Sequence, residues 1–221
     1  MPALGYSNRF TWIMTAAGIA GLYRIATDPP PLTEALLILG VCLVVTDLLS
    51  GLLHVILDNP RSLDIGPIKP LAEGFQRHHE NPSKIFEMSL YEHLFVMHLP
   101  LSIFAVIALP FWNSHLFVAY LGMIGTLHLM QMAHRWAHIP SEELHPVVRA
   151  LQRAKLLISK DIHDSHHVDP FDKNFCIMSG LFNWPLNWVV RKTSRFSHAW
   201  IGVFFVASLI PVITALFLAW R

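Results

Sequence analysis

The sequence predicts an all-α integral membrane protein, in which four to five transmembrane helices carry a cytoplasmic helical cap that holds a histidine-rich site for two metals. Three observations predict this fold: the composition, five apolar stretches, and the position of the histidines. Of the 221 residues, 53% are hydrophobic and 14% are charged, against about 25% charged residues in an ordinary soluble domain. The mean hydropathy is +0.45. This composition excludes a disordered chain, a nucleic-acid-binding protein and a typical soluble enzyme.

The apolar stretches define the expected membrane helices. A span needs about 20 largely apolar residues. Five stretches approach or meet that length: 10–26, 33–57, 89–112, 115–133 and 199–220. The first is short, and the prolines from Pro29 to Pro31 end its helix because proline cannot continue the backbone hydrogen bonding. Segment 139–198 is too polar to span, so we expect it to form the cap, and we expect one domain over 1–221 with a motif-bearing core at about 45–190.

Lysine and arginine set the expected orientation. If the N-terminus and segments 58–88 and 134–198 share one side, that side carries 14 of the 16 basic residues, and only Arg24 and Arg221 lie opposite. Basic residues mark the cytoplasmic side of membrane proteins. The sequence therefore predicts a cap and site that face the cytoplasm, and the compact length favours a bacterial inner membrane.

Eight of the 14 histidines come from four separate segments and fall on this same side. They are His54, His78, His79, His134, His138, His163, His166 and His167. His134 and His138 are four residues apart, so both rings reach one metal from the same helical face. We expect a second helix to present the last three and to end at Pro170.

The stretch 33–57 and its end carry two acidic candidates for further ligands. Asp47, Gly51, His54 and Asp58 follow a spacing of i, i+4, i+7 and i+11, which is one stripe of a helix. An aspartate such as Asp47 inside a span is expensive and usually functional. His128 lies about a turn and a half before His134 on its helix, where it can orient a ligand.

The ligand set indicates the chemistry. Neutral imidazole suits iron, zinc, copper and nickel, and two cysteines, Cys42 and Cys176, are too few for a thiolate site. Catalytic zinc takes three protein ligands, so eight histidines fit two metals with about four ligands each. Two redox-active irons near a membrane could activate O2 and attack an unactivated C–H bond, although spacing alone leaves zinc open.

Four motifs together resemble those of the plasmanylethanolamine desaturase family. They occur in order and with similar gaps over about 45–190, and they read DLLSGLLH at 47–54, FQRHHENP at 75–82, QMAHRWAH at 131–138 and HDSHHVDP at 163–170. The resemblance implies a membrane di-iron lipid desaturase with O2 as co-substrate. Its animal and bacterial members convert an alkyl ether phospholipid into a vinyl ether phospholipid, and a plant plastid relative desaturates the acyl chain of phosphatidylglycerol. A cytochrome b5 or a ferredoxin-type protein would supply the electrons, and no nucleic acid is involved.

The chain departs from the family pattern at three places. Phe171 stands where the family often has histidine after the proline of the last motif, and Phe75 replaces the leading histidine of the second. His93 stands where related enzymes place an asparagine near the metals, which makes His93 a candidate additional ligand.

Other reactions stay open at this point. An acyl-chain desaturase or a lipid hydroxylase would use the same di-iron site, and the mass of the product separates these outcomes. A zinc-dependent membrane lipid hydrolase would need only three or four of the histidines. A metal transporter is disfavoured, because transport sites lie near the bilayer midplane and these histidines gather toward one face.

Overall fold

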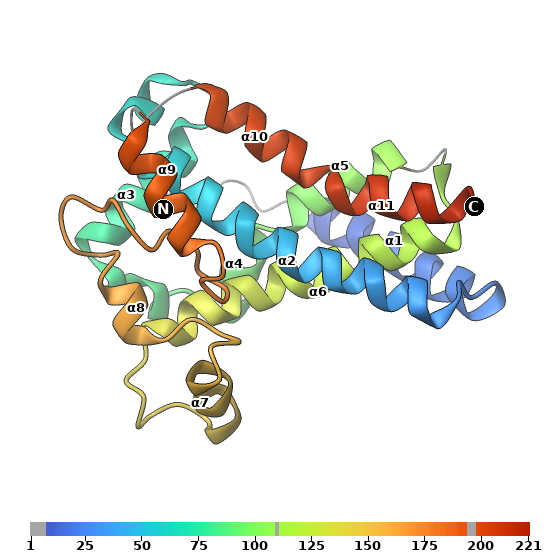
Figure 1. Ribbon diagram of the computed structural model, residues 1–221, viewed down its shortest axis with the longest axis horizontal. Helices are drawn as coiled ribbons and strands as arrows, with labels where there is room; N and C mark the ends of the chain where they lie inside the picture. Colours follow the sequence, from blue (N-terminus) through green and yellow to red (C-terminus); the bar gives the residue numbers. More distant parts are fainter. Residues whose placement is uncertain (1–7, 109–110, 194–197) are drawn as a thin grey trace. The chain divides into compact units, whose positions relative to one another are not determined.

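The computed structural model describes residues 8–108, 111–193 and 198–221, and every regular element in these ranges is helical (Figure 1). Arg195, counted above among the basic residues, lies outside them. The described helices are α1 (Asn8–Thr27), α2 (Leu32–Leu57), η1 (Pro60–Asp64), α3 (Lys69–Glu80), η2 (Pro82–Phe86), α4 (Leu90–Phe95), α5 (His98–Ala108), α6 (Ser114–Ala137), α7 (Pro146–Arg153), α8 (Lys160–Asp164), α9 (Asn183–Lys192), α10 (His198–Ser208) and α11 (Ile210–Ala219). The all-α prediction is confirmed.

Three segments are long and apolar enough to cross a membrane: Leu32–Leu57, Ser114–Ala137 and Ala199–Ala219. They indicate an integral membrane protein. The expected span at 89–112 is interrupted, because α4 ends at Phe95 and α5 contributes only His98–Ala108. The expected span at 10–26 forms the 20-residue helix α1, which carries Arg9 and Arg24 and is not among the three. A total of four to five spans therefore stays a prediction.

The described chain divides into two compact units, and α2 and α6 contribute to both. The first unit contains Met1–Val45, Leu90–His128 and Leu209–Arg221, and the second contains Thr46–Ser89 and Leu129–Ser208.

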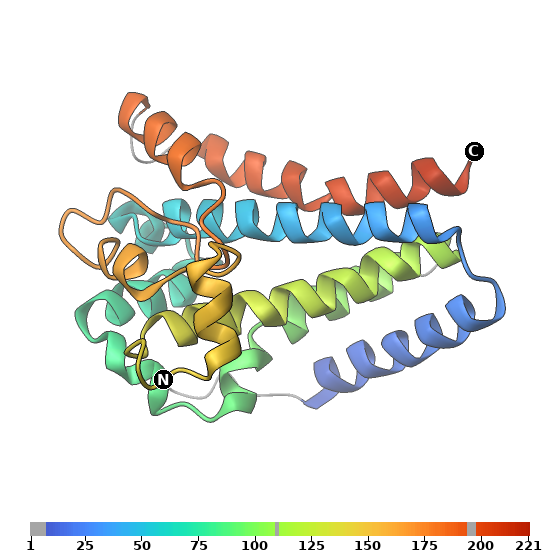
Figure 2. The same cartoon turned by 60° about the horizontal axis from the view of Figure 1, so that its bottom comes forward.

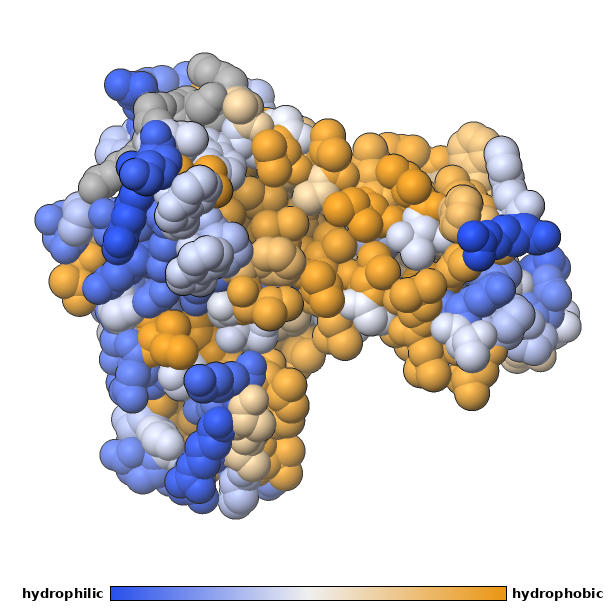
Figure 3. All heavy atoms as spheres, viewed as in Figure 1, coloured by the Kyte–Doolittle hydropathy of each residue, from blue (hydrophilic) through white to orange (hydrophobic). Residues whose placement is uncertain are grey.

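The first unit is a bundle of apolar helices. Its core joins Ile38 and Cys42 of α2 to Ala119 of α6 and Ala215 of α11, all of them inaccessible to solvent. Large apolar side chains nevertheless cover its outside, as Figure 3 shows on one face. Leu36, Ile107 and Phe217 are examples, with 58–69% of their surface exposed. Exposed apolar surface on this scale marks a face that contacts a membrane or another protein, and the long apolar helices favour a membrane.

The second unit packs α2 between two partners. On one side, Ile56 and Leu57 pack with Ala72 of α3 and with Trp200 of α10. On another side, a Cβ atom placed on Gly51 would lie 2.4 Å from Leu186 and 2.6 Å from the Cys176 sulfur. Glycine at 51 therefore lets the segment around Cys176 and the helix α9 approach the α2 backbone closely.

Three further contacts position the cap within this unit. Ala133 of α6 packs with Val148 of α7 and Leu157 in one apolar cluster. The backbone N–H of Ile158 donates to the Met178 carbonyl at 2.7 Å, and the Gln152 amide donates to the Ile158 carbonyl at 2.9 Å. The bonds tie the segment that leads into α8 to Met178 and to α7, and the apolar cluster packs α7 and Leu157 against the end of α6.

Gly51 and Gly40 form a matched pair of substitutions on α2. The Gly51→Ala change inserts a methyl group against Leu186 and Cys176, and overpacking of this kind costs about 1–3 kcal/mol. The Gly40→Ala change meets nothing within 4 Å, so the higher helix propensity of alanine leaves stability unchanged or slightly raised. Thermal unfolding in detergent, followed by tryptophan fluorescence, should show a midpoint lower by several degrees for Gly51→Ala alone. Equal midpoints would contradict the close packing at Gly51.

Candidate metal centre

The ends of four elements bring the predicted histidines together within the second unit. His54 lies near the end of α2, His78 and His79 in the last turn of α3, and His134 and His138 at the end of α6. His163 lies on α8. The expected helix to Pro170 was wrong, because α8 ends at Asp164 and the chain continues as a turn. In that turn the N–H of His166 bonds to the His163 carbonyl at 2.9 Å, and the His166 ring lies beside Asp58 and His79.

Five histidines form one buried to half-buried group. His78, His134, His138, His163 and His167 each offer one ring nitrogen, and these atoms lie within 4.8 Å of one another. The Nε2 of His138 is 3.1 Å from that of His78, 3.2 Å from that of His134 and 3.0 Å from that of His163. The Nε2 atoms of His163 and His167 are 3.1 Å apart. Metal–nitrogen bonds of about 2.0–2.1 Å place neighbouring ligand atoms roughly 3 Å apart, as they are here.

Hydrogen bonds among the rings cannot satisfy all the ring nitrogens of this group. Each neutral imidazole carries one N–H and one lone pair, so a hydrogen bond between two Nε2 atoms needs one of each. The Nε2 atoms of His78, His134 and His138 form a triangle with edges of 3.1, 3.1 and 3.2 Å. Donor and acceptor cannot alternate around three atoms, so at least one edge is always unsatisfied. A cation that receives every lone pair removes the conflict.

The local environment keeps these rings neutral. Burial, reinforced by the neighbouring His138 and His79, lowers the pKa of His78 to about 3. Burial and the imidazoles around it lower the pKa of His167 to about 2. At neutral pH both rings therefore have a lone pair available for a metal.

A second group joins Asp58, His79 and His166. The Nε2 of His79 is 3.1 Å from one Asp58 oxygen, and the Nε2 of His166 is 3.2 Å from the other. None of these four atoms has a partner with hydrogen-bond geometry in the part of the chain described. The three side chains are at most 7% exposed.

The charge on Asp58 makes this group a site for a cation as well. Burial alone would raise the pKa of the Asp58 carboxyl, but the contacts with His166 and His79 outweigh it and hold that pKa below its usual value. The Nδ1 of His166 lies 2.8 Å from the Lys173 carbonyl, which can only accept, so Nδ1 carries the proton of the neutral ring. The Nε2 of that ring then turns a lone pair toward a carboxylate oxygen. Two acceptors at 3.2 Å require a cation or a second proton between them.

His54 lies beside both groups without being part of either. Its ring centroid is 5.2 Å from that of His166 and 6.1 Å from that of His134. Its Nδ1 donates to the Ser50 carbonyl at 2.9 Å, which leaves a lone pair on Nε2. The ring of Phe75 packs edge-on against the His54 ring, with 5.0 Å between the two ring centroids.

Asp47 serves the protein scaffold. Its carboxylate accepts hydrogen bonds from the backbone N–H groups of Ser179 at 2.7 Å, Gly180 at 3.1 Å and Phe182 at 3.2 Å. Asp47 is completely buried, and these three donors satisfy the oxygens of its side chain inside α2. Asp47 thereby fastens the segment 179–182 to the helix that carries His54.

His93 and His128 belong to the first unit and to neither group of ligands among the described residues. His93 is buried on α4. The Nδ1 of His128 donates to the Ile124 carbonyl at 2.6 Å, and its ring lies 5.5 Å from that of His98. Their role as additional ligands stays a prediction.

Two residues that the sequence did not assign to the site make contacts that support it. Arg135, between two of the histidines on α6, donates to the carbonyls of Ile85 at 2.7 Å and Met88 at 3.2 Å. Phe171 adopts a positive φ of 55° and packs edge-on against His79, at 4.6 Å between centroids. The sequence did carry a signal for the role of Arg135, because an arginine between two candidate ligands on one apolar helix needs a hydrogen-bond partner. The positive φ of Phe171 had no sequence signal.

Comparison with known proteins identifies the family. Residues 43–201 match the lipid desaturase domain. The chain is 29% identical to fatty acid desaturase 4-like 1, chloroplastic, of Arabidopsis thaliana over 76% of its length, and 31% identical to the plasmanylethanolamine desaturase of Myxococcus xanthus over 77%. It is 32% identical to plasmanylethanolamine desaturase 1 of Mus musculus over 68%. These matches span 56%, 63% and 60% of the relatives' own lengths. No solved structure matches the chain. The chain belongs to the lipid desaturase family, as the motifs indicated.

Replacing Asp47 by asparagine tests the attachment of segment 179–182. The asparagine amide has one acceptor oxygen for three N–H donors. The free energy of opening the segment should therefore fall by roughly 2 kcal/mol, which raises its hydrogen-exchange rate about 30-fold. Hydrogen exchange with mass spectrometry should show faster exchange in peptides that cover this segment. The Asp28→Asn control, at an exposed ion pair with Arg24, should leave those peptides unchanged. Unchanged exchange in Asp47→Asn would contradict the assigned role.

Proposed function

We propose that this lipid desaturase introduces a double bond into a chain of a membrane phospholipid, using two irons, O2 and an external electron donor. The preferred reaction is conversion of a plasmanyl lipid into a plasmenyl lipid, the vinyl ether product. The observation that carries the proposal is the pair of buried groups, one of five histidines and one of Asp58 with two histidines. Desaturation of an acyl chain is the second candidate, favoured by the similarity to the chloroplast fatty acid desaturase.

The two groups would each hold one iron. Histidine nitrogens with a carboxylate and no thiolate form a ligand set typical of non-haem iron, and His54 is placed to complete either shell. When bound, an iron pair supplies the activation of O2 that removal of hydrogen from an unactivated carbon requires. The reaction balances when two electrons and two protons enter with O2: the lipid loses two hydrogens and two waters form. A cytochrome b5 or ferredoxin-type donor would provide the two electrons.

Backbone carbonyls orient two of the histidines, and aromatic side chains pack against two of them. The carbonyls of Ser50 and Lys173 fix the tautomers of His54 and His166, so that each directs Nε2 into the centre. Phe75 packs edge-on against His54, and Phe171 covers His79. Aromatic rings packed against these histidines limit the access of water, and exclusion of water protects a reactive site from side reactions.

We place the enzyme in a bacterial inner membrane as one domain over 1–221, with four to five spans and the metal centre toward the cytoplasm. The support is the distribution of basic residues and the three apolar spans.

Product mass tests the reaction directly. Iron-loaded protein with O2, a reducing system and either an ether phospholipid or a diacyl phospholipid should yield a product lighter by two hydrogens. The preferred reaction predicts this loss on the ether lipid, together with acid lability of the vinyl ether. A product that gains one oxygen would establish a hydroxylase instead, and a cleaved lipid would establish a hydrolase.

Single histidine changes test how many ligands the reaction needs. His167→Ala removes one member of the five-histidine group and should lower turnover by at least about 100-fold, since even residues that only support metal ligands cost 10–100-fold. His145→Ala is the control: His145 is exposed and its Nδ1 accepts from Val147 N–H at 3.3 Å at the start of α7, so turnover should persist. A zinc hydrolase with three or four ligands would instead retain activity in several such variants.

A further inference from the structure

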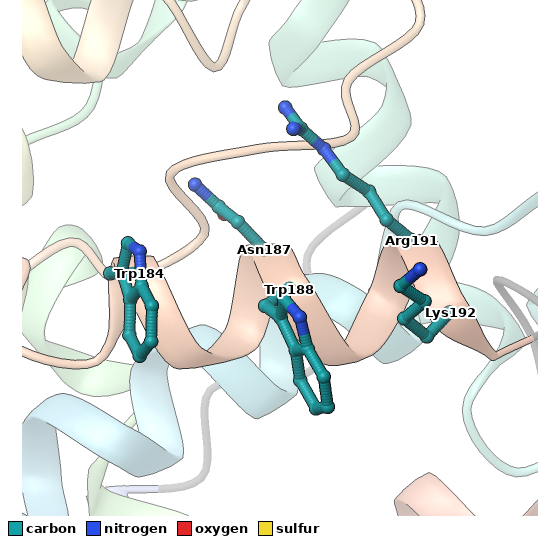
Figure 4. Close-up of a pocket in the computed structure, with 5 residues that line it drawn as sticks. All are labelled: Trp184, Asn187, Trp188, Arg191 and Lys192. Atoms are coloured by element: carbon teal, nitrogen blue, oxygen red, sulfur yellow. The ribbon is translucent and has the colours of Figure 1, made fainter.

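A groove on the outer face of α9 combines aromatic and basic side chains. Its volume is about 430 Å³, and it is lined by Trp184, Asn187, Trp188, Arg191 and Lys192. Small-molecule sites occupy roughly 300–1,000 Å³, so the groove is large enough for a lipid headgroup. Figure 4 shows Trp184, Trp188 and Lys192 following one side of the helix, with Asn187 and Arg191 on the adjacent side.

The exposed tryptophans require an explanation. Leu186 and Val190 turn into the unit and are 6% and 3% exposed, whereas Trp184 is 78% and Trp188 is 59% exposed. Two large aromatic side chains four residues apart form an apolar strip that faces outward. Tryptophan is enriched at the boundary between membrane and water, where its ring meets the headgroups and its N–H finds a partner.

The chain tethers α9 to this boundary. Lys192 ends α9, and the apolar span begins at Ala199, seven residues later. Seven residues reach at most about 25 Å when fully extended. The basic end of α9 therefore lies within that distance of a segment that enters the bilayer.

The charges in the groove select an anion. α9 contains no acidic residue, and among the described residues no carboxylate lies within 4 Å of Arg191 or Lys192 to form an ion pair. Both side chains are exposed. A phosphate would meet two cations here, whereas the ammonium of an ethanolamine or choline headgroup would find no counter-charge on this helix.

We propose that the outer face of α9 binds the phosphate of an anionic bilayer phospholipid, with the two tryptophans seated at the lipid surface. The site is distinct from the metal centre but connected to it. The side-chain oxygen of Asn187 accepts from the backbone N–H of Asn174 at 2.8 Å. The side-chain amide of Asn174 donates to the hydroxyl of Ser165, the residue before His166, at 2.7 Å. The proposal rests on the membrane location of the chain and not on the reaction.

Lipid binding by the full chain in mild detergent tests the site. Native mass spectrometry with dioctanoyl-phosphatidylglycerol and dioctanoyl-phosphatidylcholine should show a preference for the anionic lipid. The double change Arg191→Gln and Lys192→Gln should weaken binding of that lipid by about 25-fold, at about fivefold for each charge near the lipid surface. The matched control, Arg153→Gln with Lys155→Gln, removes two exposed cations elsewhere on the same unit and should change the affinity less than about twofold.

Three results would overturn the proposal: equal binding of the two lipids, an equal loss in the control variant, or binding of inorganic phosphate as tight as binding of the lipid. Product analysis on the same variants separates this proposal from the proposed reaction. Loss of the lipid preference with normal product would leave the desaturase function intact.

Discussion

The structure of the second unit depends on one electrostatic constraint: ring nitrogens and a carboxylate that face each other across about 3 Å need cations between them. The triangle of His78, His134 and His138 has no arrangement of protons that satisfies all three edges. Asp58 adds a buried negative charge opposite a ring whose proton is held elsewhere. Buried polar groups without partners are strongly destabilising, so metal binding and correct folding of this unit are expected to be coupled.

The scaffold around the centre shows how the chain meets that constraint. α2 supplies Asp47, Gly51 and His54 along one stripe, Asp58 follows directly after the helix ends at Leu57, and each of the four has a different task. Asp47 holds the segment 179–182, and Gly51 allows Cys176 and Leu186 close to the helix. One turn after Gly51, the His54 ring lies beside both groups of candidate ligands. Two turns after Gly51, Asp58 belongs to the second group. This one stripe thus fastens segment 179–182 of the cap and also carries two of the residues proposed to hold metal, His54 and Asp58.

The sequence predicted the all-α class, the long apolar helices α2 and α6, and the convergence of histidines, because hydropathy and i, i+4 spacing report helix faces directly. It could not predict that the last three histidines lie on a short helix and a turn, since HDSHHVDP fits one helical face as well. It suggested Asp47 as an additional ligand or as a residue that supports the ligands, because an aspartate inside a span is usually functional, and it could not predict that the partners of Asp47 are backbone N–H groups 132–135 residues away. Such long-range backbone contacts leave no local pattern. The break between α4 and α5 was likewise invisible to a hydropathy count.

Metal content per chain tests the central claim most directly. Protein purified without oxygen in mild detergent should contain two irons per chain by elemental mass spectrometry, and the Asp58→Asn variant should retain the metal of the five-histidine group and lose the other. One zinc per chain, with no iron after growth in iron-supplemented medium, would contradict both the two-metal centre and the desaturase chemistry built on it.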